Sequence, residues 1–122
     1  MGRRRPADRL EDIRSAAADV LAFTDGLDAA GFADLPTADR RTWRALKNAL
    51  AEIGEAVKDL PPDIATRHPA IDWRGFAGLR DVVAHAYFGL DLQRLWPTVT
   101  AEMPALLAAV TAELARLRAE DP

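Results

Sequence analysis

WRALKNALAEIGEAVKDL, the stretch from Trp43 to Leu60, decides the fold of this chain. Its apolar residues recur at steps of three or four, as one face of an α-helix requires. They are Trp43, Leu46, Leu50, Ile53, Val57 and Leu60. Thr37 can cap the start of this helix, and the Pro61–Pro62 pair ends it because proline cannot continue a helix. The stretch therefore predicts one long amphipathic helix.

Two further helices are expected on either side of this stretch. The earlier one covers about residues 7–27, and Gly26 and Gly31 mark its exit. The later one begins at Asp72, a good N-cap residue, and ends near Gly89. Both carry apolar residues at helical spacing, so each can pack one face against the central helix.

The C-terminal part repeats the apolar spacing from residue 92 to residue 117. Pro97 and Pro104 fall inside this pattern, so we expect two helical pieces with a kink or break between them. Asp91 is expected to cap the first piece, and Pro104 suits the first turn of the second. No strand-like alternation of useful length occurs. The predicted fold is all-α, an antiparallel up-and-down bundle of four main helices plus a short extra helix.

Length and composition predict a single globular domain. The chain has 122 residues, 49% of them hydrophobic, and a chain of this size can bury a core of its own. We expect one domain over residues 1–122, with residues 1–5 and 119–122 frayed. No stretch approaches ~18 uninterrupted apolar residues, so we expect no membrane partner and a cytoplasmic location.

Charge and residue usage narrow the possible chemistry. The net charge of -3 argues against a protein that coats nucleic acid through bulk charge, although a local phosphate site stays open. The absence of cysteine excludes disulfides, thiolate metal sites and cysteine nucleophiles. Because the two histidines show no zinc-binding spacing, we expect neither a metal ion nor another cofactor.

Polar residues are concentrated on the second half of the third predicted helix. They are Arg80, Asp81, His85 and Tyr87. Asp81 and His85 are four residues apart and share a helix face, so a carboxylate–imidazole hydrogen bond is within reach. Arg80 and Tyr87 share another face. Arg80 and His85 are separated by roughly 140° around an ideal helix. They converge only if the helix is distorted or if two copies meet across a two-fold axis.

Arginine, histidine and an orienting aspartate suit the cleavage of phosphodiesters in RNA. A neutral imidazole can remove the proton of a ribose 2′-OH, and a guanidinium can stabilise the charge that grows on the phosphate. DNA lacks this hydroxyl, so the mechanism predicts RNA alone. The spacing by itself leaves other interpretations open: Arg80 as the partner of any nearby acid, His85 as a capping or packing residue, Tyr87 as a core aromatic, and His68 as a loop residue without a partner.

The pattern Arg80-x4-His85-x-Tyr87 resembles the Rx4HxY signature of the HepT-like toxins, which belong to the HEPN superfamily of all-helical nucleases. Residues after the signature also resemble this family, namely Phe88-Gly89, Asp91-Leu92 and Trp96. Three earlier stretches do so as well: residues 53–56, Leu60-Pro61 and residues 68–74. The likeness covers nearly the whole chain and is strongest between residues 60 and 99.

This resemblance implies a homodimer in which the third helices approach each other and line one cleft. It implies a metal-independent endoribonuclease that acts as the toxin of a type II/VII-like toxin–antitoxin system. The implied partner is an MntA-type nucleotidyltransferase antitoxin that adenylylates the motif tyrosine, here Tyr87. Arg80 would bind the phosphate and His85 would act as the base. Asp81 stands where the family often has asparagine, and its charge would repel phosphate.

Two other functions fit the sequence. One is a catalytically inactive helical dimer that acts as the nucleotide-binding or substrate-binding subunit of a minimal nucleotidyltransferase. The other is a structural domain whose helical faces pair with a partner protein. Cleavage of RNA by the purified chain separates the ribonuclease from both alternatives.

Overall fold

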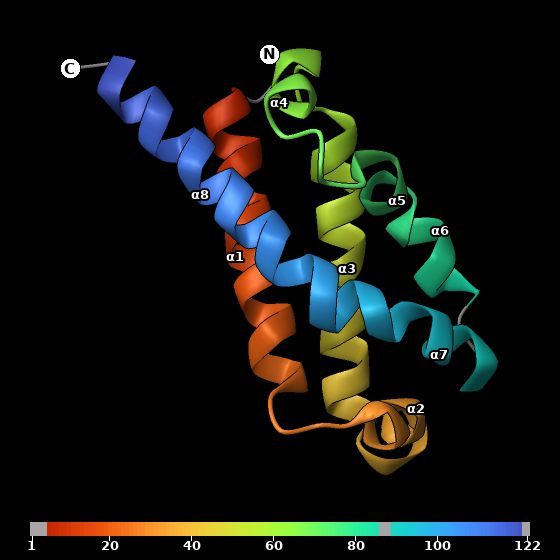
Figure 1. Cartoon of the computed structure of the whole chain (residues 1–122). Coiled ribbons are helices and arrows are strands. Elements are labelled where there is room, and N and C mark those ends of the chain that lie inside the picture. The colour runs from red at the N-terminus through yellow and green to blue at the C-terminus, as the bar shows by residue number, and fades with distance from the viewer. Residues whose placement is uncertain (1–4, 86–88, 121–122) are drawn as a thin grey trace.

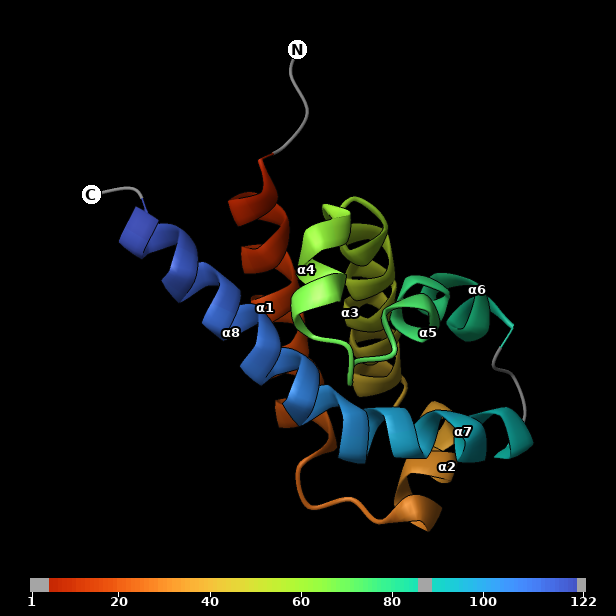
Figure 2. The same ribbon diagram turned by 45° about the horizontal axis from the view of Figure 1, so that its top comes forward.

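The computed structural model describes residues 5–85 and 89–120, and this part of the chain contains helices and turns but no strand. The all-α prediction is therefore confirmed. The α-helices are α1 (Pro6–Thr24), α2 (Ala29–Ala38), α3 (Arg40–Lys58), α4 (Pro62–Arg67), α5 (Trp73–Ala77), α6 (Leu79–Ala84), α7 (Gly89–Pro97) and α8 (Met103–Glu120). A π-helical segment, η1 (Thr98–Glu102), joins α7 to α8. The start of α1 and the end of α8 lie at the same end of the molecule, opposite α2 (Figures 1 and 2).

The long helices α1, α3 and α8 form the core of the bundle. Helix α1 packs against both α3 and α8, while α5 and α6 lie on the side of α3 that faces away from α1 (Figure 1). The apolar spacing predicted for the central helix is confirmed. Its buried members are Trp43, Leu46, Leu50, Ile53 and Val57. Leu60 lies beyond the end of α3 and is half-buried.

Helix α2 is the main element that sequence periodicity missed. Gly26 does mark the exit from α1, with a φ of 79° that favours glycine. Gly31, however, lies inside α2, where its N–H donates to Asp28 Oδ1 at 2.7 Å. Glycine and an internal Pro36 argue against a helix here. Burial of Phe32, whose ring centroid lies 5.1 Å from that of Trp96, offsets these propensities.

The caps of α3 and the third predicted helix differ from the expectations in detail. Thr37 lies inside α2, and the N-cap of α3 is Asp39, whose Oδ1 accepts from the Thr42 N–H at 3.2 Å. Asp72 is confirmed as an N-cap, since its Oδ1 accepts from the Gly75 N–H at 3.0 Å. The helix that follows is not continuous as predicted, because it breaks at Gly78 into α5 and α6.

Gly54 lets the backbone of α3 approach the junction between α5 and α6. A Cβ atom at this position would lie 3.1 Å from the backbone nitrogen of Arg80 and 3.3 Å from the carbonyl oxygens of Phe76 and Ala77. All three neighbours are backbone atoms, so even alanine would push the two helices apart. This close approach places the start of α6 directly against α3.

The helix continues past the two prolines near the C-terminus and changes direction around η1 (Figure 2), which confirms the kink that was one of the two predicted outcomes. Helices α7 and α8 run on through η1, where the Met103 N–H donates to the carbonyl of Thr98 five residues earlier. Pro104 supplies no N–H to an α-helical ladder, and a π-turn accommodates such a gap. Asp91 lies inside α7 and is not the cap that the sequence predicted.

The continuous helix from Leu92 to Glu120 is long and apolar enough to cross a membrane by length and composition alone, with a mean hydropathy of 1.2 in its most apolar window. No such helix was expected from the sequence, which has no run of about 18 uninterrupted apolar residues. Leu106 and Val110 of this helix are fully buried in the core of the bundle, and α8 packs along α1. Packing inside the bundle therefore accounts for part of its apolar surface, since 39% of that window is buried.

A buried carboxylate fastens α4 to α8. Glu113 of α8 is 3% exposed, and it accepts hydrogen bonds from Arg67 Nε at 3.0 Å and from Arg116 Nε at 3.3 Å. His68 Nε2 lies 2.8 Å from the same carboxylate. Hydrogen bonds from Arg67, which has the largest effect, and from His68 and Arg116 lower the pKa of Glu113 from 4.5 to about 2. This carboxylate is ionised and paired, which is the condition for burying a charge.

His68 extends this cluster to the start of α5. Its carbonyl oxygen accepts a hydrogen bond from Trp73 Nε1 at 2.9 Å, and the two rings meet edge to face. Glu113 thereby helps to fix where the α5–α6 segment begins. His68 does lie in a loop, but the expectation that it has no partner is wrong. Its partner is 45 residues away and meets it only when α8 packs onto the bundle.

Glu113→Gln should destabilise the fold by about 2–3 kcal/mol near neutral pH, less than the 3–5 of a fully buried pair, because glutamine still accepts hydrogen bonds and Arg67 is 33% exposed. The pKa of Glu113 is lower in the folded protein than in the unfolded chain. The ionised carboxylate therefore contributes fully to folding stability above about pH 4.5, and this contribution is lost as the pH falls towards about 2. Urea titrations near pH 7 and near pH 3 test this. A stability difference that stays the same in acid would contradict the ionic role.

Candidate functional site

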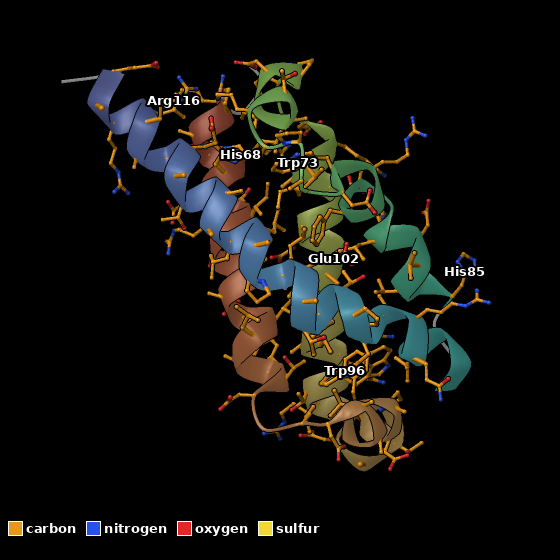
Figure 3. All side chains as sticks on the ribbon, in the orientation of Figure 1. His68, Trp73, His85, Trp96, Glu102 and Arg116 are labelled. Carbon is orange, nitrogen blue, oxygen red and sulfur yellow. The ribbon has the colours of Figure 1, made fainter. Side chains whose placement is uncertain are left out.

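Helix α6 presents the predicted site residues on its exposed side. Leu79 and Val83, four residues apart, are buried and hold α6 against α3. The other residues of the segment are exposed, and they are Arg80, Asp81, Val82, Ala84 and His85. His85 lies at the edge of the molecule, away from the cluster of His68, Trp73 and Arg116 (Figure 3). An exposed imidazole is not a core packing residue.

The imidazole of His85 is oriented by a backbone carbonyl. Its Nδ1 lies 2.8 Å from the carbonyl oxygen of Asp81. A carbonyl oxygen only accepts, so Nδ1 carries the proton and the neutral ring keeps its lone pair on Nε2. Nε2 can therefore take up a proton, as a general base must.

The hydrogen bond predicted between the Asp81 carboxylate and His85 is replaced by this backbone contact. His85 is the C-cap of α6, with φ -114° and ψ 10°. The last carbonyls of a helix lack intrahelical partners, and the ring reaches one of them. Asp81 thus orients His85 through its main chain, so the contact does not depend on the charge of its side chain.

Arg80 forms an ion pair with a residue that the sequence analysis did not single out. Its Nη1 lies 3.0 Å from Glu55 Oε1 on α3, and its side chain remains 63% exposed. The hydrogen bond from Arg80 lowers the pKa of Glu55. Glu55 follows Gly54, so the close approach of α3 to α6 brings the two charges together. The only sequence signal for Glu55 was its place in the stretch of residues 53–56 that resembles the family.

Arg80 and His85 line different grooves of the single chain. His85 lines a groove of about 360 Å³ between α5–α6 and the segment α7–η1. Arg80 lines another of about 470 Å³ beside α1 and α3, together with Glu55. The break at Gly78 precedes both residues in the chain and does not bring them together. The sequence argument that the two residues diverge within one helix therefore holds in the structure.

Neither the predicted modification site nor a metal site is present among the described residues. Tyr87 lies outside the described residues. For the side chains that the structure describes, no three histidine, aspartate or glutamate residues lie close enough together to hold a metal ion. The arrangement on α6 thus consists of a general-base candidate, a phosphate-binding candidate and a neighbouring carboxylate from α3.

The model of the family described as "Ribonuclease HepT-like" matches residues 13–113 of this chain. The chain belongs to this family. The HepT-like chain is 41% identical over 99 residues to the "Probable ribonuclease HepT" of Thermococcus cleftensis, covering 81% of this chain and 86% of that protein. It is 32% identical over 112 residues to a Methanocaldococcus jannaschii protein that carries RNase in its name, covering 92% and 89% of the two chains. No solved structure matches significantly.

Family membership confirms the resemblance inferred from the Arg80-x4-His85-x-Tyr87 pattern. The matched span of this HepT-like chain contains every residue of that pattern, and it also contains Glu55. The roles of the individual side chains remain predictions.

Proposed function

We propose that this HepT-like chain is a metal-independent endoribonuclease in which His85 is the general base and Arg80 binds the phosphate. One observation carries the proposal: an exposed imidazole whose Nδ1 is bound to a carbonyl, so that Nε2 is free to accept a proton. Arg80, exposed on the same short helix, supplies a guanidinium that suits phosphate geometry. The names of the two relatives agree with this activity.

The reaction is a transfer within the RNA strand. His85 Nε2 accepts the proton of a ribose 2′-OH, and the 2′ oxygen forms a bond to the adjacent phosphorus. The bond from phosphorus to the 5′ oxygen breaks, and that oxygen takes a proton from solvent or from a protonated His85 of a second copy. Arg80 stabilises the negative charge on the phosphate oxygens. The products end in a 2′,3′-cyclic phosphate and a 5′-hydroxyl.

A homodimer across α6 is part of this proposal. Arg80 and His85 of one chain line different grooves. In a single copy, therefore, the guanidinium and the imidazole do not face the same phosphodiester. Val82, between them in sequence, is a large hydrophobic side chain that is 44% exposed. An exposed apolar residue between two functional residues favours a contact with a second copy. A two-fold axis there would pair Arg80 of each copy with His85 of the other.

The wider role proposed is that of a cytoplasmic toxin in a type II/VII-like toxin–antitoxin system. The proposed antitoxin is an MntA-type nucleotidyltransferase that adenylylates Tyr87. A phenol carrying AMP adds a bulky anion close in sequence to Arg80 and His85, which would block RNA. Co-expression with such an enzyme should add the mass of AMP to the tryptic peptide that contains Tyr87. Growth arrest that persists under co-expression with unmodified Tyr87 would contradict the regulatory role.

Incubation of the purified chain with matched RNA and DNA oligonucleotides tests the proposed activity. We expect cleavage of the RNA in the presence of EDTA, fragments ending in 2′,3′-cyclic phosphate, and intact DNA. RNA blocked by 2′-O-methyl groups at every position serves as the control, because it lacks the attacking hydroxyl. Nucleotide binding without any cleavage of RNA would favour the alternative function, the inactive binding subunit of a nucleotidyltransferase.

A further inference from the structure

The groove beside His85 has features of a nucleotide site that the general base and Arg80 do not explain. It lies between α5–α6 and the segment α7–η1, and its volume of about 360 Å³ falls within the ~300–1,000 Å³ typical of small-ligand sites. Its lining includes the apolar side chains of Phe76, Leu79 and Leu95. Apolar walls of this kind accept the flat face of a nucleobase.

Arg94 supplies a positive charge to this groove from α7. Its side chain is exposed and lines the same groove as His85, which Arg80 of the same chain does not. Among the described side chains, no carboxylate forms an ion pair with Arg94. The Arg94 guanidinium stands in the groove that holds the general base, and no carboxylate of the described part of the chain neutralises it.

The two carboxylates of the groove are engaged differently. Asp72 is the N-cap of α5 and accepts the Gly75 N–H. Glu102, half-buried in η1, accepts a hydrogen bond from the Thr98 hydroxyl through Oε2 at 3.0 Å. Among the described residues, nothing donates to Glu102 Oε1. This oxygen can accept a hydrogen bond from the amino group of a base, as acidic side chains do for the amino group of cytosine.

We propose that the groove between α6 and α7 is a nucleotide-binding subsite, in which Arg94 binds an RNA phosphate next to the cleaved bond and Glu102 contacts the edge of the adjacent base. The inference rests on the proposed ribonuclease function, because His85 in the same groove places the cleaved bond beside it. The subsite prefers bases that carry an exocyclic amino group to uracil, because the single N3–H donor of uracil is flanked by two carbonyl oxygens that the carboxylate repels.

Arg94→Ala tests the phosphate contact by binding alone. The probe is a fluorescent single-stranded RNA with 2′-O-methyl groups throughout, which cannot be cleaved. We expect the Kd measured by anisotropy to rise about 10- to 100-fold, as for the loss of a charged hydrogen bond. The slope of log Kd against log salt should become shallower by about 0.7, the value for one phosphate on a single strand.

Arg118→Ala is the matched control, since Arg118 is exposed and lies near the far end of α8. It should leave both the Kd and the salt slope unchanged. Glu102→Gln should reduce the preference for bases with an amino group over uracil, because the glutamine amide can also donate to the carbonyl oxygens of uracil. Circular dichroism confirms that each variant is folded.

The outcomes separate this inference from the proposed function. If the wild type cleaves RNA and Arg94→Ala binds the uncleavable strand as tightly as Arg118→Ala does, the subsite is refuted and the ribonuclease stands. If Arg94→Ala loses binding while the wild type cuts no RNA, the ribonuclease proposal fails and the nucleotide site stands. Unchanged base preference in Glu102→Gln refutes the base contact.

Discussion

His85→Ala should lower the rate of RNA cleavage by about 10²–10⁴-fold, the range for loss of a general base. The change should act on kcat, because the imidazole is needed when the 2′-OH loses its proton. His85 is exposed at the C-cap of α6, so the variant should keep the thermal stability of the wild type. Single-turnover cleavage of a labelled RNA and a thermal melt measure the two quantities.

Asp81→Ala is the matched control for this variant. The contact to His85 Nδ1 comes from the main-chain carbonyl of residue 81, which alanine retains. Asp81→Ala should therefore keep most of the RNA-cleaving activity. If the Asp81 carboxylate were what orients His85, the same variant would lose most of that activity. Full cleavage by His85→Ala would overturn the assignment of the general base.

Arg80→Ala should lower RNA cleavage by about 10²–10³-fold, as the loss of one electrostatic contact to a transition state does. Arg80→Lys should recover part of this loss, since lysine keeps the charge but lacks the planar fork that grips two phosphate oxygens. The fold should be unaffected, because the side chain is 63% exposed and its ion pair with Glu55 lies at the surface. Cleavage rates for the three proteins on one RNA test this series.

Mixing the two inactive variants tests whether the site is shared between copies. If each active cleft combines Arg80 of one copy with His85 of the other, a dimer of Arg80→Ala with His85→Ala contains one complete cleft. Co-refolding of the two variants should then restore cleavage to at most about half of the wild-type rate in each mixed dimer. No recovery in mixed dimers would show that both residues act within one chain, or that Arg80 has another role.

The proposed general base, His85, and the positions of Arg80 and Asp81 relative to it could be predicted from the sequence. All three residues lie within six positions of one another, so helical geometry relates them. Helical geometry predicts that Arg80 and His85 diverge, and the structure places them in different grooves. The contact between His85 and Asp81, four residues apart, was predicted correctly. It is made by the main-chain carbonyl of Asp81, however, and not by the carboxylate that the sequence suggested. A side chain at a helix end meets free carbonyls, and the predicted helix ran past residue 85, so this possibility did not arise.

Other parts of the site depend on residues that are distant in the sequence. Glu55 meets Arg80 from 25 residues away, and this requires the glycine contact between α3 and α6. Arg94 reaches the His85 groove because α7 forms the side of that groove opposite α6. Nothing in the spacing of either residue reveals its neighbour.

The sequence by itself determined the all-α class, the buried face of α3, the kink near Pro104 and the Arg80–His85 pattern on which the function is proposed. Each of these depends on helical periodicity or on the backbone chemistry of proline, which act over a few residues. Only the tertiary structure decided the presence of α2, the break at Gly78 and the partners of Arg80 and His68. Helix α2 and the break at Gly78 arise because packing energy outweighs the local propensity of the backbone. The partners of Arg80 and His68 are brought to them by segments that are distant in the sequence, so no local pattern reveals them.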